Sequence, residues 1–365
     1  MKRVVLLATA LTGAGGIQRF NRLLVQALSE SCREQGGSVD VLVLADHEVP
    51  DKLSHCVSAR VFGGNRLAFA AVALAAAARS DVVLMGHRNF LPLALPIQAA
   101  ARVRRQPRVA LVVHGIEAWD RWSRSSRWAA RRVDRLVAVS RYTAERCAAA
   151  NDLRHVAVAV LPDALDPAFE PALKMPDTAR PDAGPRLLLT VSRLGRGDEY
   201  KGVDTVIRAL PAVLAAWSEA RLVVIGDGSL IPELRALAAS LGVSGAVQFR
   251  GWVSDEQLTR AYAECAVFVL PSAGEGFGLT HLEAMAFGRP VVGARAGATP
   301  EVVCDGTTGL LVPYGSAPAL ADALIRLLAD DKLRGRLGAA GRARVAEGFT
   351  YKHLAARTRQ IIATL

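Results

Sequence analysis

The feature that most constrains the fold is an alternation of short apolar runs with segments of helical spacing. In the first half of the chain the runs fall at Val4–Ala10, Val39–Ala45, Asp81–His87, Val109–His114, Leu136–Ser140 and Val156–Leu161. Between them, apolar residues recur at helical spacing, as in Leu67–Arg79. Strands buried on both faces of a parallel sheet appear in a sequence as near-continuous apolar runs. The alternation therefore predicts an α/β fold with a mostly parallel, doubly wound sheet.

A proline-rich segment interrupts the alternation, which then starts again. Prolines at positions 167, 171, 176, 181 and 185 predict a linker. Beyond it we expect strands and helices in turn at Leu187–Ser192, Val203–Trp217, Arg221–Ile225, Ile231–Leu241, Val247–Gly251, Asp255–Ala263, Val267–Pro271, Thr280–Phe287 and Pro290–Ala294. The tail from Ala317 onward is helical by periodicity. A length of 365 residues suits two α/β domains better than one.

Charge and cysteine content limit the classes of protein to which the chain can belong. The net charge of +11 indicates an anionic partner, such as a nucleotide, a lipid phosphate, a membrane surface or a nucleic acid, unless the basic residues are only a solvated surface. The 5 cysteines are scattered and form no C-x-x-C pair. They argue against a disulfide scaffold or a zinc site, and for a reducing compartment.

The N-terminal apolar run imitates a signal peptide, because Lys2 and Arg3 precede it. However, the run leads directly into a glycine-rich loop that includes Gly16, as a first strand leading into a phosphate loop would. The longest apolar stretch, Leu67 to Ala78, is too short to cross a bilayer. We therefore expect a cytoplasmic protein that meets the inner face of the cell membrane only peripherally.

The segment with the strongest chemical signal is Pro271-Ser-Ala-Gly-Glu275-Gly-Phe-Gly278-Leu-Thr-His-Leu-Glu283, where a strand, a glycine-rich turn and a helix follow one another. Glycines let backbone N–H groups approach a ligand closely, and the helix start adds unpaired donors and a positive dipole end, which suits a diphosphate. Glu275 is placed to accept hydrogen bonds from sugar hydroxyls, and Glu283 to reach a ribose. His281 is interpreted as a packing residue or a local polar contact.

This segment resembles the E-x7-E signature of family 4 of the retaining glycosyltransferases, which have the GT-B fold. The resemblance covers nearly the whole chain and is strongest from Arg193 onward. It implies two Rossmann-like, doubly wound domains that face each other across a cleft. The expected division is an acceptor-binding domain over residues 1–170, a linker over 171–185, a sugar-nucleotide-binding domain over 186–348, and a C-terminal helix over 349–365 that packs back on the first domain.

Two basic residues, Arg193 and Lys201, follow a strand and precede a helix. Two cations there neutralise a diphosphate leaving group, whose charge grows in the transition state. In a basic protein, however, two exposed bases are also common. The resemblance implies that both hold the donor diphosphate, although the loop between them is long for the family.

The first domain contributes two further candidates, Gly16 and His114. The loop around Gly16 lacks the full G-x-G-x-x-G spacing and a ribose acid downstream, which argues against a dinucleotide enzyme. The resemblance implies that Gly16 lies near the donor phosphate and that His114 contacts the donor sugar near the reacting carbon. His114 is not expected to be a general base, because the leaving phosphate takes the acceptor proton in this family.

The resemblance therefore assigns catalysis to His114, Glu275, Arg193 and Lys201. It assigns donor binding to Gly16, Arg193, Lys201, Val253, Glu275, Gly276, Phe277, Gly278, Leu279, Thr280 and Glu283. The chain contains no Asp-x-Asp pair, the motif with which glycosyltransferases of the other main fold hold a metal. We expect neither a metal nor a cofactor, and the sugar nucleotide is a substrate.

On the acceptor side, Trp119, Trp122 and Trp128 are interleaved with arginines, and Arg102, Arg104, Arg105 and Arg108 form a second basic cluster. Tryptophan and arginine together suit the headgroup layer of an anionic membrane, although inward-packed tryptophans on a solvated helix would look the same. By resemblance, the predicted acceptor is a saccharide, linked to polyprenyl diphosphate, in polysaccharide biosynthesis. The predicted donor is a GDP- or UDP-sugar, with GDP-mannose first.

Three other functions remain open at this stage. A sugar-nucleotide epimerase of the GT-B fold would use the same donor without an acceptor. A basic nucleic-acid-binding protein is permitted by the charge, but no nucleic-acid-binding motif appears, so we expect no nucleic-acid partner. A scaffold that has lost catalysis would not need the full set of candidate residues.

Overall fold

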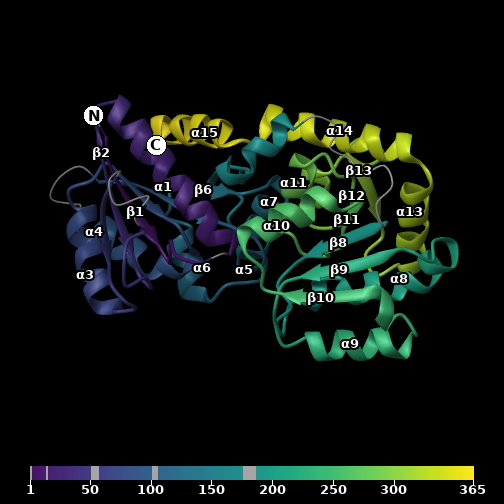
Figure 1. Ribbon diagram of the computed structural model, residues 1–365. Coiled ribbons are helices and arrows are strands. Elements are labelled where there is room, and N and C mark those ends of the chain that lie inside the picture. The colour runs from purple at the N-terminus through teal and green to yellow at the C-terminus, as the bar shows by residue number, and fades with distance from the viewer. Residues whose placement is uncertain (1, 14, 51–56, 101–105, 176–185) are drawn as a thin grey trace. The chain divides into compact units, whose positions relative to one another are not determined.

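The computed structural model contains two parallel sheets, one in each of two units of the chain (Figure 1). It describes residues 2–13, 15–50, 57–100, 106–175 and 186–365. The first unit comprises Met1–Asp166 and Tyr351–Leu365, and the second comprises Pro167–Thr350. Within the predicted linker, residues up to Lys174 belong to the 3-10 helix η3 (Pro167–Lys174), whereas residues 176–185 lie outside the described residues.

The sheet of the first unit has the strand order β3-β2-β1-β4-β5-β6-β7, and all its pairs are parallel. Its strands are β1 (Arg3–Ala8), β2 (Ser38–Val43), β3 (Ser58–Val61), β4 (Val82–Met85), β5 (Arg108–Val113), β6 (Arg135–Ala138) and β7 (Ala157–Val160). The helices are α1 (Gly16–Glu34), α3 (Arg66–Ala77), η1 (Arg88–Leu93), α4 (Ala94–Ala100), α5 (Ile116–Trp119), α6 (Arg124–Ala130), α7 (Arg141–Asn151) and α15 (Tyr351–Thr364).

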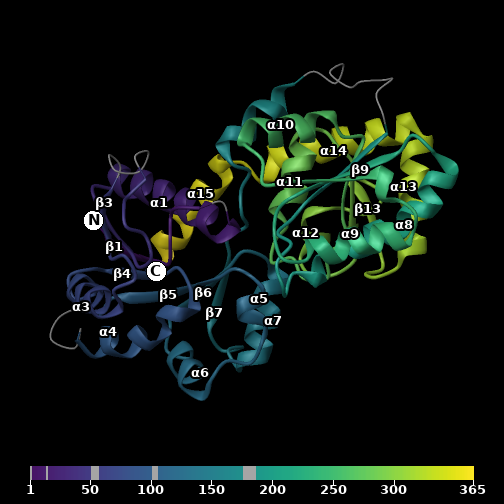
Figure 2. The same cartoon turned by 60° about the horizontal axis from the view of Figure 1, so that its bottom comes forward.

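Helix α15 ends the chain and belongs to the first unit, where it lies along α1 (Figures 1 and 2). Lys2 Nζ donates to the carbonyl of Ile362 at 2.7 Å, and Arg359 pairs with Glu34 of α1 at 2.6 Å. These contacts join the last helix to the residue before the first strand and to the first helix of the same unit.

The sheet of the second unit is also wholly parallel, with the order β10-β9-β8-β11-β12-β13. Its strands are β8 (Leu187–Val191), β9 (Arg221–Ile225), β10 (Val247–Gly251), β11 (Val267–Leu270), β12 (Val291–Ala294) and β13 (Gly309–Val312). The remaining elements are η5 (Glu199–Lys201), α8 (Val203–Ala216), α9 (Ile231–Ser240), η6 (Ser244–Ala246), α10 (Asp255–Glu264), α11 (Leu279–Ala286), α12 (Thr299–Val302), α13 (Ala317–Ala329) and α14 (Asp331–Gly348).

The predicted pair of Rossmann-like, doubly wound domains is confirmed. Strands β4, β11 and β12 are buried along their whole length, as their continuous apolar runs predict. The sequence missed strands β3 and β13 and helices α7 and α12. Among the described residues, none of the helices combines the length and the apolar character needed to cross a membrane.

Candidate functional site

In both sheets the strand order reverses at one point, between β1 and β4 in the first unit and between β8 and β11 in the second. Ligands of open parallel sheets bind outside the carboxyl ends of the strands at such a switch point. In the second unit, Arg193 follows β8 and Glu275 follows β11, so these two predicted residues flank the switch point. In the first unit, Gly16 follows β1 and begins helix α1.

The glycine-rich turn between β11 and α11 is held by backbone hydrogen bonds from both sides. The N–H of Ala273 donates to the carbonyl of Tyr200 at 2.8 Å, and the N–H of Ala298 donates to the carbonyl of Glu275 at 3.0 Å. Gly297 adopts a φ of +58°, and a Cβ there would lie 3.0 Å from the Glu275 backbone nitrogen and oxygen. The loop before α12 therefore packs directly on the turn and fixes its shape.

Lys201 and Glu275 form a nearly buried ion pair in this turn. Lys201 Nζ lies 2.7 Å from Glu275 Oε1, and the two side chains are only 14% and 10% exposed. Burial raises the Glu275 pKa, but the charge of Lys201 and hydrogen bonds from Lys201 and Ser272 outweigh it, so the pKa lies below its usual value. Burial lowers the Lys201 pKa, but Glu275 outweighs it, and the pKa is raised. Both groups are therefore charged, and Lys201 reaches the turn despite the long preceding loop.

Arg193, the other predicted cation, is exposed. Its side chain is 73% exposed, and its Nη2 pairs with Asp198 Oδ1 at 2.9 Å. The same Asp198 accepts the Gly195 N–H at 3.1 Å through its other oxygen, which shapes the loop after β8. The half-buried Val253 follows β10 and directly precedes Ser254, the N-cap of α10.

The rest of the predicted donor segment runs through the turn into α11. Gly278 is the N-cap of this helix with a φ of +107°, a conformation that favours glycine. Gly276, Leu279 and Thr280 are half-buried, whereas Phe277 is buried. Glu283 is also buried, and its Oε2 accepts a hydrogen bond from Tyr262 Oη at 2.7 Å.

In the first unit, His114 lies at the carboxyl end of β5. Its Nε2 hydrogen bonds with the carbonyl of Gly86, which follows β4, at 2.9 Å, and the ring packs edge-on against Phe20 of α1 at 5.0 Å. Burial lowers the His114 pKa, opposed by Glu117 and by the bond to Gly86. A neutral imidazole at this edge suits a polar contact with a ligand, as predicted for His114.

The sequence did not single out Asp163, a buried carboxyl group that follows β7 at the same edge. Burial raises its pKa to about 7, even though the positive charge of Arg19 opposes the shift. Arg19 lies in the first turn of α1 and pairs with Asp166 at 3.5 Å. No sequence motif includes Asp163, and its raised pKa follows only from its burial in the folded protein.

The three tryptophans divide between the two interpretations that the sequence left open, two packing inward and one facing solvent. Trp119 and Trp122 are buried, with indole N–H groups that donate to Thr143 Oγ1 and to the Glu117 carbonyl. Only Trp128 is exposed, at 49%. The helical stretch is interrupted between α5, which ends at Trp119, and α6, which begins at Arg124, and Trp122 lies in that interruption. Residues 101–105, which hold three arginines of the second basic cluster, lie outside the described residues.

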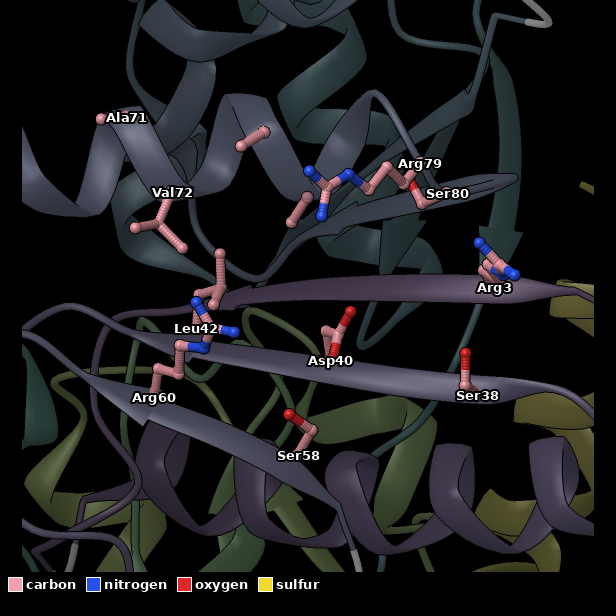
Figure 3. Close-up of a pocket in the computed structure, with 12 residues that line it drawn as sticks. Arg3, Ser38, Asp40, Leu42, Ser58, Arg60, Ala71, Val72, Arg79 and Ser80 are labelled. Carbon is pink, nitrogen blue, oxygen red and sulfur yellow. The ribbon is translucent and has the colours of Figure 1, made fainter.

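A separate pocket of about 490 Å³ opens between α3 and strands β1, β2 and β3 (Figure 3). Arg60 enters it from the sheet and Arg79 from the segment after α3, while Arg3 lies at its far end beside the strand starts. Arg3 and Ser38 are the first residues of β1 and β2, so the pocket reaches the amino edge of the sheet. It is therefore distinct from the carboxyl edge, where the predicted residues lie.

Two family models together match most of the chain. The model described as glycosyl transferases group 1 matches residues 185–330, and the model described as glycosyltransferase family 4 matches residues 14–169.

Relatives and solved structures were also found. The GDP-mannose-dependent alpha-(1-6)-phosphatidylinositol monomannoside mannosyltransferase of Mycobacterium tuberculosis is 35% identical over 295 residues, which cover 77% of this chain and 75% of the relative. The phosphatidyl-myo-inositol mannosyltransferase of Mycobacterium leprae is 42% identical over 159 residues, 43% of this chain and 42% of that protein. Anabaena HepE, solved with UDP and glucose, has a TM-score of 0.76 at 20% identity, with 100% of both chains covered, and shares the fold.

Proposed function

The chain belongs to the group 1, family 4 glycosyltransferases, and we propose that it is a retaining, metal-independent enzyme that transfers mannose from GDP-mannose to a lipid-linked saccharide. The observation that carries the proposal is the buried Lys201–Glu275 pair at the start of α11. It puts one cation and one carboxylate at the point of the sheet where a ligand binds.

The chemistry of this pair suits a sugar diphosphate. An ammonium group has three N–H donors, and Glu275 uses one of those on Lys201. The remaining donors, together with the backbone N–H groups of Leu279 and Thr280, for which an α-helix supplies no acceptor in its first turn, are available to phosphate oxygens. The Glu275 carboxylate has further lone pairs for sugar hydroxyls. Charge that develops on the leaving diphosphate is thus met by Lys201 and the helix start.

The names of the relatives support GDP-mannose as the donor and suggest a narrower class of acceptor. The M. tuberculosis relative is named for GDP-mannose and for phosphatidylinositol monomannoside, and the M. leprae relative for phosphatidyl-myo-inositol. We therefore place a phosphatidylinositol-linked saccharide ahead of a polyprenyl-diphosphate-linked one as the acceptor. Both present an anionic phosphate beside the accepting sugar, which suits a chain with a net charge of +11.

Retention is proposed from the family resemblance, and metal independence is proposed because Lys201 and the start of α11 supply positive charge for the diphosphate. In the proposed reaction the bond between the anomeric carbon and the diphosphate oxygen breaks, a bond from the anomeric carbon to the acceptor oxygen forms on the same face, and the acceptor proton passes to the leaving diphosphate. NMR of the product linkage tests the first claim, because an inverted anomer would refute retention. EDTA tests the second, since strict dependence on added Mg²⁺ would refute metal independence.

We also propose peripheral contact with an anionic membrane. Helix α6 supports it, because the exposed Trp128 carries the guanidinium of Arg132 at 3.8 Å from its ring centre. Such a pair suits the headgroup layer, where an indole ring and a cation are both solvated favourably. Co-sedimentation with phosphatidylglycerol vesicles tests this, with Trp128→Ala expected to weaken binding. Equal sedimentation with neutral phosphatidylcholine vesicles would refute an electrostatic contact.

The first experiment is thermal stabilisation by GDP, UDP, ADP, GDP-mannose and UDP-glucose. A ligand at about 100 times its dissociation constant adds roughly 2.7 kcal/mol of stability. A shift that is selective for GDP and GDP-mannose supports the proposal. No shift with any nucleotide would refute a donor site, and turnover of GDP-mannose without an acceptor would favour an epimerase.

A further inference from the structure

His281 spans the glycine-rich turn from its exit to its entrance. It is the third residue of α11, it is completely buried, and its Nε2 lies 3.1 Å from the carbonyl oxygen of Leu270, the last residue of β11. A carbonyl oxygen only accepts hydrogen bonds, so Nε2 must carry the proton. One side-chain hydrogen bond therefore joins the end of the strand to the start of the helix.

Packing alone does not explain a histidine at this position. With the proton on Nε2, Nδ1 is a bare acceptor, and it has no hydrogen-bond partner among the described residues. A buried acceptor without a partner is unfavourable, so an apolar side chain of similar size would avoid a loss of stability. Only a side chain with an N–H or O–H donor, however, can bond to Leu270.

The surroundings of the ring match this neutral form. Nδ1 faces Gly278, where a Cβ would lie only 2.8 Å away, and Phe268 of β11 packs edge-on at 5.7 Å. The charged groups that act on the ring are Glu275 and Lys201, which oppose each other. Burial lowers the His281 pKa, opposed by Glu275 and by the bond to Leu270, so the ring is uncharged at neutral pH.

We propose that His281 is a positioning residue of the donor site, a clasp that fixes the turn carrying Glu275 and the start of α11. Its bond to Leu270 sets the separation of the two ends of the turn. The backbone N–H groups and the carboxylate within the turn are then held in place before a ligand arrives, and preorganisation of this kind reduces the ordering that binding requires. The ligand-binding consequence rests on the proposed function, whereas the clasp itself does not.

Two substitutions separate the clasp from simple packing. His281→Gln keeps an N–H donor at a similar distance from the backbone as the imidazole Nε2, and His281→Leu fills the space without a donor. Met285→Leu, a volume-conserving change of a buried residue later in the same helix, is the matched control. The first measurement is hydrogen exchange of the backbone amides of residues 272–280 without ligand. The second is the affinity for GDP and UDP.

We expect faster exchange in the turn and about tenfold weaker nucleotide binding for His281→Leu, the factor that corresponds to about 1.4 kcal/mol. His281→Gln and Met285→Leu should stay close to the wild type in both measurements. A turn that exchanges equally in the Leu and Gln variants overturns the clasp. If the wild type binds neither nucleotide, the donor assignment fails, and the exchange data still decide the role of His281.

Discussion

Replacing only one partner of the Lys201–Glu275 ion pair should lower the free energy of unfolding far more than replacing both. The two side chains are 14% and 10% exposed and meet at 2.7 Å. Lys201→Met or Glu275→Gln alone leaves its neighbour without its ion-pair partner, and removing one partner of a buried pair costs about 3–5 kcal/mol. The double variant buries no charge there and should lose much less. We therefore expect a coupling free energy of about 3 kcal/mol between the two positions.

Differential scanning calorimetry is the suitable assay, because the chain has two units and one two-state fit would mix them. The transition of the second unit should move to lower temperature in each single variant and recover in the double variant. If Lys201→Met and the double variant melt together, Glu275 does not depend on Lys201, and the reasoning from burial is wrong.

The pH dependence of the same variants has a definite sign. The folded-state pKa of Glu275 lies below its ordinary 4.5, so its stabilisation is present above pH 4.5 and is lost as the pH falls through the folded-state value. The folded-state pKa of Lys201 lies above its ordinary 10.5, so its stabilisation is present below pH 10.5 and is lost as the pH rises through the folded-state value. In Lys201→Met the unpaired Glu275 takes up a proton more readily, so the loss of stability should shrink as the pH approaches 4.

Three further predictions concern single positions. The Asp163 pKa is raised from 3.8 to about 7, so the stabilisation by its neutral form is complete below pH 3.8 and is lost as the pH rises through about 7. Relative to the wild type, the free energy of unfolding of Asp163→Asn should therefore increase by up to about 4 kcal/mol between pH 4 and pH 8. Stability curves of the two proteins that run parallel over this pH range would contradict the shift. Gly297→Ala places a Cβ 3.0 Å from the Glu275 backbone at a φ of +58°, and should lower the free energy of unfolding by about 1–3 kcal/mol. An unchanged melting temperature in calorimetry would contradict this. Arg193→Ala removes an exposed pair with Asp198, so stability should change by less than about 1 kcal/mol while GDP affinity falls; a large drop in melting temperature would show that Arg193 is structural.

Most strands could be predicted from the sequence because they form apolar runs that alternate with segments of helical spacing. Strands β9 and β10 have the predicted bounds, and β8 and β11 end within one residue of them. Strand β3 was missed because it is a four-residue edge strand in which exposed and half-buried residues alternate. Strand β13 was missed although it is buried along its whole length, because Gly309 and Pro313 bound an apolar run of only three residues, Leu310–Val312. Neither strand has an apolar run as long as those of β4 and β11, which were identified from theirs.

The sequence named Lys201 and Glu275 as candidate residues but could not predict the contact between them. The sequence places Lys201 at the end of a long loop, and only the short 3-10 helix η5 shows how that loop folds back to bring Nζ to Glu275. The exposure of the tryptophan side chains could not be predicted from the sequence either, because tryptophan and arginine interleave in the same way whether the rings face solvent or the core. The break between α5 and α6 decides it, and it buries Trp119 and Trp122.

The two cations proposed to bind the donor diphosphate, Lys201 and Arg193, differ in how far the protein fixes them before a ligand binds. Lys201 is held in a low-dielectric position by a carboxylate that stays ionised, so it adds positive charge without having to be ordered on binding. Arg193 is exposed and paired with Asp198, which also shapes its own loop, so it must exchange that partner to meet a diphosphate. Preorganised charge is worth most in the transition state, where reorganisation would otherwise add to the barrier. We therefore propose that Lys201 contributes mainly to the rate of transfer, and Arg193 mainly to the capture of the donor.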